Sequence, residues 1–301
     1  MRRPAAGRRG ARPRGFTLIE IAVVIVVLSL LLAMIAGIGT AMLGQQRREA
    51  TRQRLAGVET ALALFVSQHQ RLPCPANGQL VGTDANAGLE QLTVGTPNTC
   101  TVAGVANSQQ HGVLPWRSLG LSEQDATDGW GNRLTYRAAG AFITAPAMNM
   151  TYCDPGGTDN TPELLASPGG YCDSACTSAT FPVSCTLPSA VTAGRGLEVR
   201  NLAGSPIMNP GATPSTGAAY VVVSHGENGK GAYNNQGVLQ GGAWAAPAEN
   251  EERKNDASLA LAVHFVDDFF IDSGAVHFDD FVLRPSILTV ATKAQLGPRA
   301  H

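Results

Sequence analysis

A single carboxylate stands at the start of a long apolar run. Glu20 is followed by residues 21–43, which carry no charged side chain. An ionisable group inside a membrane helix costs about 2.5–3.5 kcal/mol near its centre and less near the interface. Such a group is retained where it has a function, and the chemistry that a carboxylate offers in lipid is ion pairing with an amine. Glu20 is therefore the first candidate functional residue.

Residues 15–20 read G-F-T-L-I-E and follow an arginine-rich leader. This arrangement resembles the class III signal of type IV pilins and type II secretion pseudopilins. The resemblance implies that a prepilin peptidase and N-methyltransferase cuts between Gly15 and Phe16 and methylates the new amine of Phe16. It also implies that this amine pairs with Glu20 of a neighbouring subunit during filament assembly.

Composition fits an exported protein once the leader is set aside. Residues 1–15 carry six arginines and no acid, so their removal takes the formal net charge from −1 to −7. A negative mature chain predicts no nucleic-acid partner. Only 15% of residues are charged and 34 are glycine, which favours a loop-rich β domain over a helical cytosolic enzyme.

One long helix is predicted from residue 16 to residue 71. Residues 16–44 form its membrane-spanning or filament-core half, because residues 21–43 would make a helix of roughly 34 Å. A secretory signal peptide is the alternative, but the apolar segment is too long and no A-x-A cleavage site follows it. Residues 45–71 continue as an amphipathic helix with an apolar stripe of Leu55, Val58, Leu62, Phe65 and Val66.

The expected location is the bacterial inner membrane, as a single-pass protein with a cytoplasmic N-terminus. The leader's arginines favour this orientation, although Arg47, Arg48, Arg52 and Arg54 follow the other end of the apolar run. All six cysteines lie beyond that run, as expected for a domain in an oxidising compartment. Residues 72–301 are therefore predicted to be a periplasmic domain or part of an extracellular filament.

The cysteines predict disulfides. Cys74 and Cys100 are the only cysteines of the loop-rich stretch 73–127. A loop of that length in a compact domain needs a cross-link, so we expect these two cysteines to form a disulfide. The other four lie in a Gly/Pro/Ser/Thr-rich insertion at 151–190, where the exported context favours disulfides over a zinc site. Three pairings are open to them, of which one is Cys153 with Cys172 and Cys176 with Cys185.

The rest of the chain predicts an α+β fold of pilin type: the long helix packed on an antiparallel sheet, with a long loop region and the Cys-rich insertion. A D-G-W-G-N turn at 128–132 resembles the stretch that opens the sheet in pseudopilins. Further β-rich segments lie at residues 134–136, 196–201, 218–224, 263–271 and 277–283, the last two joined as a hairpin through 272–275.

Two later segments also resemble pseudopilins: S-H-G-E-N-G-K-G at 224–231 and F-D-D-F at 278–281. In the major pseudopilins a loop between comparable landmarks binds calcium, which implies a possible Ca²⁺ site here with Asp279 and Asp280 as its carboxylates. The alternative is that Asp279 only anchors the turn. No other cofactor is expected. The wider set of acid and amide oxygens that a hard cation could use comprises Glu227, Asn228, Glu251, Asp256, Asp267, Asp268, Asp279 and Asp280.

The family resemblance implies a pilin-like subunit, either a type II secretion pseudopilin acting in protein secretion or a minor type IV pilin. Its implied partners are prepilin peptidase, other pilins or pseudopilins, an assembly platform and an ATPase. A low-copy tip pilin that acts as an adhesin or binding module is the alternative. A membrane-anchored hydrolase is a remote one, because Ser224 and His225 are strand neighbours that point to opposite faces and no G-x-S-x-G elbow is present. We therefore expect no enzyme.

Overall fold

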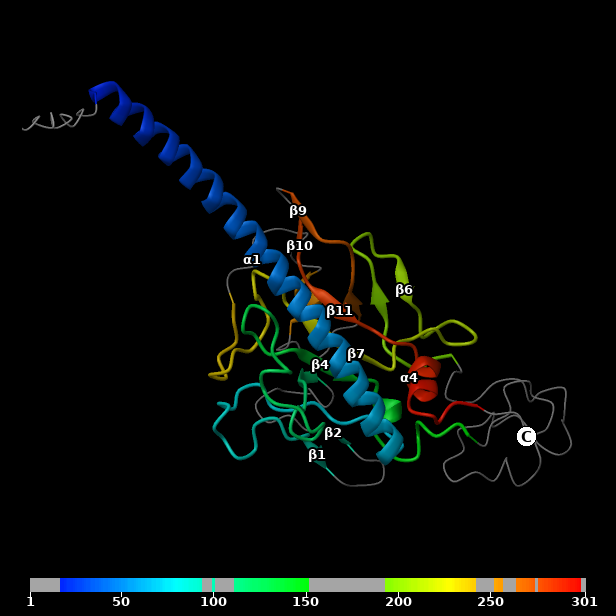
Figure 1. The fold of residues 1–301 in the computed structure, drawn as a ribbon. Coiled ribbons are helices and arrows are strands. Elements are labelled where there is room, and N and C mark those ends of the chain that lie inside the picture. Colours follow the sequence, from blue (N-terminus) through cyan, green and yellow to red (C-terminus); the bar gives the residue numbers. More distant parts are fainter. Residues whose placement is uncertain are drawn as a thin grey trace, which may run out of the picture. The chain divides into compact units, whose positions relative to one another are not determined.

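The computed structural model describes residues 17–93, 99–100, 111–151, 193–241, 252–256, 264–273 and 276–298, with backbone alone for 35–41, 111, 272–273 and 276. The chain divides into two compact units, residues 1–46 and 47–301, and each is treated separately below. Helix α1, Leu18–His69, begins in the first unit and ends in the second (Figure 1). Its bounds agree with the predicted helix to within two residues.

The first unit consists of the N-terminal part of α1. Its apolar side chains are exposed from Leu18 to Met34, with exposed fractions between 49% for Val27 and 88% for Leu18. Such a surface needs a cover of lipid or of other helices, because soluble monomers rarely expose apolar patches of this extent. Taking the described residues alone, none of the helices combines the length and the hydropathy required of a membrane span.

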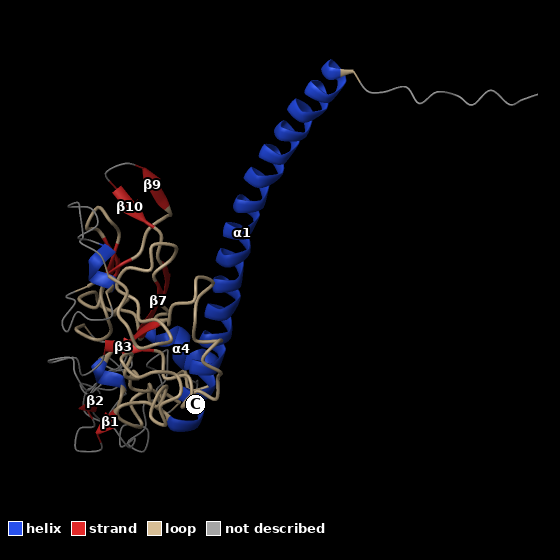
Figure 2. Ribbon diagram, turned by 90° about the vertical axis from the view of Figure 1, so that its left-hand side faces the viewer, coloured by secondary structure: helices blue, strands red, loops and turns tan. Residues whose placement is uncertain are grey.

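In the second unit, one face of α1 enters the core. Leu55, Val58, Leu62 and Val66 are buried, as the spacing of three and four residues predicted. The helix ends at His69, and Gln70 takes a positive φ of 54° that turns the chain away. Figure 2 shows the strands gathered on one side of this part of the helix.

The helix packs on a four-stranded antiparallel sheet of order β11-β7-β4-β3. Strand β7, Tyr220–Ser224, is buried along its whole length. Tyr220 and Val222 pack in the cluster that contains α1, whereas Val221 and Val223 pack in a second cluster on the other face. Burial on both faces explains the continuous apolar run of this central strand. Its neighbours are β3 His111–Val113, β4 Thr135–Ala138 and β11 Phe281–Leu283.

A smaller sheet of order β6-β5-β8 covers the second face. Strand β5, Val199–Arg200, pairs antiparallel with β6, Pro206–Met208, and parallel with β8, Phe265–Val266. The remaining described elements are the hairpins β1 Leu92–Thr93 with β2 Thr99–Cys100 and β9 Ile271–Ser273 with β10 Val276–Phe278, the 3-10 turns η1 Gly140–Phe142 and η3 Arg253–Asn255, and helix α4 Ile287–Lys293.

The fold class is α+β as predicted, but the strand assignments at the C-terminal end were partly wrong. The segment predicted as one strand at 263–271 is divided between β8 and β9, and that at 277–283 between β10 and β11. Each division falls at an acidic pair. Asp267 bonds the Arg284 guanidinium (2.6 Å), and Asp268 accepts from the backbone N–H of Leu202 (3.0 Å). These bonds turn the chain out of the strand, so only β9 and β10 form the predicted hairpin.

Several further elements were missed, among them β6, β3 and α4. Strand β3 lies in the stretch predicted as loop, and its pairing with β4 places it at the edge of the main sheet. Helix α4 begins after Ser286, whose hydroxyl accepts from the Thr289 N–H (3.2 Å) as an N-cap. Ile287 and Val290 of this helix are buried against the core that contains α1.

The disulfide predicted between Cys74 and Cys100 is present. Cys74 and Cys100 are joined by a disulfide with an S–S distance of 2.00 Å, and both residues are fully buried. It fixes β2 to the segment that follows α1. The other predicted disulfide residues, Cys153, Cys172, Cys176 and Cys185, lie outside the described residues.

Removal of this disulfide by Cys74→Ala with Cys100→Ala is expected to lower the free energy of unfolding by about 3.5 kcal/mol. The cysteines are 26 residues apart, and the entropy of closing a loop of that size in the unfolded chain gives this magnitude. Urea unfolding of the detergent-extracted chain measures it, with Ala76→Gly as a control for a small buried change nearby. A loss no larger than that of the control would contradict the prediction.

Candidate functional sites

The first candidate site is the start of α1, where Thr17 and Glu20 hold each other. The Glu20 Oε2 atom accepts from the Thr17 N–H (2.8 Å) and from the Thr17 hydroxyl (2.9 Å), and the Glu20 N–H donates to Thr17 Oγ1 (3.4 Å). This reciprocal pattern is a capping box. Sequence reasoning missed Thr17, although T-x-x-E before an apolar run is its usual sequence pattern. Gly15 and Phe16 lie outside the described residues.

Glu20 keeps one oxygen available for a second interaction. In the described part of the chain its carboxylate accepts hydrogen bonds through Oε2 alone, and no basic side chain among the described residues contacts it. The residue is exposed together with the apolar side chains that follow it. A carboxylate that caps its own helix through one oxygen can accept an external amine through the other.

The second candidate site lies where β7 ends and β11 begins. These strands are neighbours in the sheet, so the turn at 225–231 lies beside Asp279 and Asp280, which precede β11. Gly226 has a φ of +56°, and a Cβ on it would overlap the backbone and carboxyl carbon of Asp279. Only glycine permits this approach. The structure thus brings together the two segments that the sequence had singled out.

Glu252, His277 and Asp279 form a compact group. One potential ligand atom of each lies within 4.8 Å of the others. Asp279 Oδ2 accepts from the Asn228 N–H (2.9 Å), and the Asn228 side-chain amide donates to Glu252 Oε1 (3.0 Å). His277 Nε2 lies 3.4 Å from Asp279 Oδ1. Asn228 therefore orients both carboxylates.

Asp280 is buried next to this group but has different partners. Its Oδ2 atom accepts from the Asn255 side-chain amide (2.7 Å), and its Oδ1 atom lies 4.0 Å from His225 Nδ1. Burial raises the pKa of Asp280 well above its ordinary value, and the neighbouring negative charge of Glu252 adds to the effect. Burial, together with the hydrogen bond to Asp279, raises the pKa of Glu252 to about 7.

Three buried carboxylate oxygens in this cluster have no hydrogen-bond partner among the described residues: Glu252 Oε2, Asp279 Oδ1 and Asp280 Oδ1. Burying an ionised carboxylate without compensation is costly, so the cluster must either take up protons or bind a cation. Of the predicted pair, Asp279 belongs to the group of three and Asp280 does not. Glu252 and His277 were missed by the sequence analysis. They lie 25 positions apart, and this separation matches no metal-binding spacing pattern.

The D-G-W-G-N turn connects this end of the sheet to α1. The Asp128 carboxylate accepts from the N–H groups of Trp130 and Asn132 (2.9 Å each) and, through Oδ2, from the Ser224 hydroxyl (2.9 Å). Burial raises the pKa of Asp128. His225 bonds Thr135 through Nε2 (2.7 Å). In these bonds Ser224 and His225 have different partners.

This turn also packs closely on the helix. A Cβ on Gly129 would overlap the backbone of Arg47, and the Gly129 N–H donates to Thr51 Oγ1 (2.9 Å). Arg54 donates to the carbonyls of Thr127 (2.8 Å) and Asp128 (2.7 Å). Glycine is required at position 129 because the two backbones approach closely. The buried Thr51 hydroxyl is required because it accepts the hydrogen bond of the Gly129 N–H.

Comparison with known families gives a match at the N-terminal end of the chain. Residues 11–36 match the family described as the prokaryotic N-terminal methylation motif, and this range includes Gly15, Phe16 and Glu20. No curated protein and no solved structure matches the chain. The motif, together with the long helix on an antiparallel sheet, supports the type IV pilin and pseudopilin family and a precursor that prepilin peptidase processes.

Proposed function

We propose that the chain is a pilin-like subunit, a type II secretion pseudopilin or a minor type IV pilin, which is cut after Gly15 and assembled into a helical filament based in the inner membrane. The observation that carries the proposal is the methylation motif at residues 11–36. Cleavage frees the amine of Phe16, and this cation pairs with Glu20 of a neighbouring subunit. Pairing offsets the desolvation cost that each charge would have alone in lipid.

The exposed apolar surface of α1 supports assembly. Residues 18–34 present Leu, Ile, Val and Met side chains around the helix, so lipid would cover them before assembly and neighbouring helices afterwards. A contact of this kind between different surfaces of adjacent copies, repeated with rotation and rise, builds an open filament. A cytoplasmic ATPase and an assembly platform would supply the work of extraction from the membrane.

The proposed topology is single-pass, with the leader in the cytoplasm and the second unit in the periplasm or the filament. The Cys74–Cys100 disulfide supports this side of the membrane, because structural disulfides persist in oxidising compartments. The insertion at 151–190 favours a low-copy subunit. A tip pilin that binds a surface through this insertion is the second candidate, and it differs from the first in position within the filament.

Processing is the test of this proposal. Intact mass and N-terminal sequencing of the membrane-extracted chain should give a start at Phe16 only when prepilin peptidase is present. Gly15→Leu should leave the leader in place, because a side chain at the cleavage position blocks the cut. Gly10→Leu is the matched control within the same leader and should be processed normally. Processing of Gly15→Leu, or a start elsewhere in the wild-type chain, would refute the proposal.

We further propose that the acidic cluster holds Ca²⁺ through Glu252 and Asp279, with Asp280 buried beside them. The three buried oxygens that have no hydrogen-bond partner in the described part of the chain favour a cation here, and carboxylate oxygens are the ligands that calcium prefers. His277 stands at the rim, with 30% of its side chain exposed. An imidazole suits zinc better than calcium, so the two metals must be compared.

Calcium is expected to raise the melting temperature by about 5–10 °C at pH 8, at a concentration about 100 times the dissociation constant. At pH 5 the shift should nearly vanish, because Glu252, with its pKa raised to about 7 by burial, is then protonated and cannot bind the metal. In EDTA, without bound metal, the stability of the chain itself should change with pH in the opposite direction and be higher at pH 5 than at pH 8. A raised carboxyl pKa stabilises the fold fully below the ordinary value of 4.5, and this contribution is lost as the pH rises through 7.

Thermal unfolding of the detergent-extracted chain in calcium, zinc or EDTA at both pH values measures these shifts. Glu252→Gln and Asp279→Asn should each abolish the calcium shift, whereas Glu49→Gln, an exposed acid on α1, should keep it. A shift with zinc and none with calcium would reassign the site to an imidazole-bound metal. No shift with either metal would show that the cluster is balanced by protons alone.

A further inference from the structure

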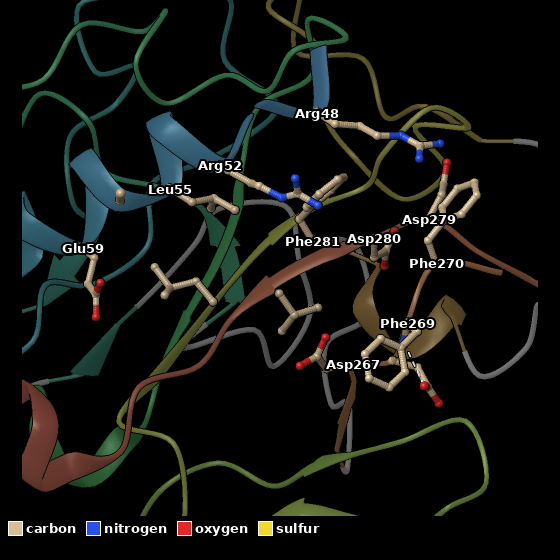
Figure 3. A pocket seen from close by; sticks show the side chains of 14 residues that line it. Arg48, Arg52, Leu55, Glu59, Asp267, Phe269, Phe270, Asp279, Asp280 and Phe281 are labelled. Atoms are coloured by element: carbon tan, nitrogen blue, oxygen red, sulfur yellow. Dashed lines mark hydrogen bonds between the residues drawn. The ribbon is translucent and has the colours of Figure 1, made fainter. Parts of the chain in front are cut away.

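Two adjacent phenylalanines are exposed in the loop between β8 and β9. Phe269 is 87% exposed and Phe270 49%. Figure 3 shows this loop facing α1, with Arg48 and Arg52 reaching toward it. The Arg48 guanidinium lies 4.0 Å from the centre of the Phe270 ring, a cation–π contact. These four residues, Phe269, Phe270, Arg48 and Arg52, form what we call the aromatic patch, at the edge of an open groove of about 480 Å³.

The two arginines of the patch lie among several acids. Residues 47–54 contain four arginines and one acid, Glu49, which lies 3.9 Å from Arg52 in an exposed pair. The acids that face the groove have other partners. Asp267 bonds Arg284, Asp268 accepts from backbone N–H groups, and Glu59 pairs with Lys293. Asp279 and Asp280 are buried. Among the described residues no acid therefore bonds Arg48.

The patch lies close, along the chain, to the end of the apolar run. Arg48 follows Leu43 by five residues, which is about 7.5 Å of helix and at most about 18 Å of extended chain. The headgroup layer on each side of a bilayer is roughly 5–7.5 Å thick. If residues 21–43 span the hydrocarbon core, this short length of chain allows Arg48 to reach the headgroup layer.

We propose that the aromatic patch docks on anionic lipid headgroups of the periplasmic leaflet and holds the subunit against the membrane before assembly. Phenylalanine is among the apolar residues that surface-bound segments insert at the boundary between headgroups and acyl chains, and arginine binds phosphate with two parallel N–H donors. The proposal rests on the proposed membrane-anchored subunit. Positive residues usually flank the cytoplasmic end of a membrane helix, whereas these arginines follow its other end. The proposal explains their position, because they would bind headgroups there.

Bromolipid quenching tests the proposal on the full chain. Phe269→Trp is reconstituted at low protein density into vesicles of phosphatidylethanolamine with brominated chains, with or without phosphatidylglycerol. The parent chain provides the background of the native tryptophans. The control is Val238→Trp, at a residue that is 56% exposed in the turn before Leu239. Quenching of the indole introduced by Phe269→Trp should be at least twofold stronger than in the control, and Arg48→Gln with Arg52→Gln or neutral lipid should reduce it.

Equal quenching at the two positions would overturn the proposal. So would quenching that is independent of both the arginines and the anionic lipid. Protection of the indole only at high protein density, with crosslinks between chains, would assign the patch to a neighbouring subunit instead. Extraction of the chain from the vesicles by alkaline carbonate is measured first. Release at that step would refute the membrane anchor and this proposal together, whereas retention with no quenching refutes the docking alone.

Discussion

Replacing Arg133 by methionine is expected to lower the free energy of unfolding by about 3–5 kcal/mol, because its buried guanidinium is the charged partner of Glu123 and of several carbonyls. Arg133 is 1% exposed. Its Nη1 atom donates to the carbonyls of Gly78 (2.9 Å) and Leu80 (2.6 Å). Its Nε (2.9 Å) and Nη2 (2.6 Å) atoms donate to Glu123 Oε1, and Nη2 also to the Asn235 carbonyl (3.2 Å). One guanidinium therefore joins three loops.

The loss follows from what the substitution leaves behind. Methionine fills much of the same space but donates nothing, so the Glu123 carboxylate and three carbonyls lose a charged partner. The face of Trp116, 4.9 Å from the guanidinium, also loses its cation–π contact. Urea unfolding of the detergent-extracted chain measures the change, at neutral pH and with calcium held constant.

Arg117→Met is the matched control. Arg117 is exposed and donates to the carbonyls of Ala85 (2.8 Å) and Gly82 (3.3 Å). Water can replace a donor at these exposed groups, so the loss should be under about 1 kcal/mol. Comparable losses in the two variants would mean that the buried guanidinium contributes no more to stability than a surface one.

The helix and the central strand could be predicted because their burial repeats with a short period. The stripe through Leu55, Leu62 and Val66 repeats every three or four residues, and the fold buries that stripe. The run Val221–Val223 is apolar at every position, which is the pattern of a strand covered on both faces, by α1 and by the smaller sheet. In both cases local sequence and long-range packing favour the same structure.

The short strands could not be placed because their partners are distant in sequence. Strand β8 has two residues and pairs in parallel with β5, 66 positions earlier. Nothing in residues 263–271 distinguishes this pairing from the hairpin that was predicted. The strand is interrupted at Asp267, whose carboxylate accepts a hydrogen bond from Arg284. Only the folded arrangement shows that partner.

The candidate sites follow the same rule. Glu20 could be identified from the sequence because a charged residue next to a long apolar run is unusual, whatever fold the rest of the chain adopts. Asp279 was found from a resemblance, whereas Glu252 was overlooked in favour of its neighbour Glu251. Glu252 enters the cluster through Asn228, which bonds it and Asp279 at once. That geometry depends on a turn and a segment 24 residues apart, for which the sequence carries no periodic pattern.

Glu20→Gln is expected to reduce incorporation into filaments at least tenfold while leaving processing intact. Glutamine keeps the capping box, because its amide oxygen can accept from the Thr17 N–H as the carboxylate does. It removes only the negative charge. The amine of Phe16 would then be buried in lipid without its partner, and a penalty of about 1.4 kcal/mol or more per subunit is enough for a tenfold loss.

Thr17→Ala is the complementary variant and separates the two functions of the Glu20 carboxylate. It removes the hydroxyl that bonds Oε2 and the Glu20 N–H, which should cost the helix about 1 kcal/mol, but it keeps the charge. If pairing with the neighbouring amine drives assembly, Thr17→Ala should assemble within a few fold of the wild type. The assembled fraction is measured by sedimentation of sheared filaments, after intact mass has shown equal processing of all three chains. Equal defects in the two variants would mean that Glu20 serves the start of its own helix, and that the register between subunits is set by the apolar surface of α1.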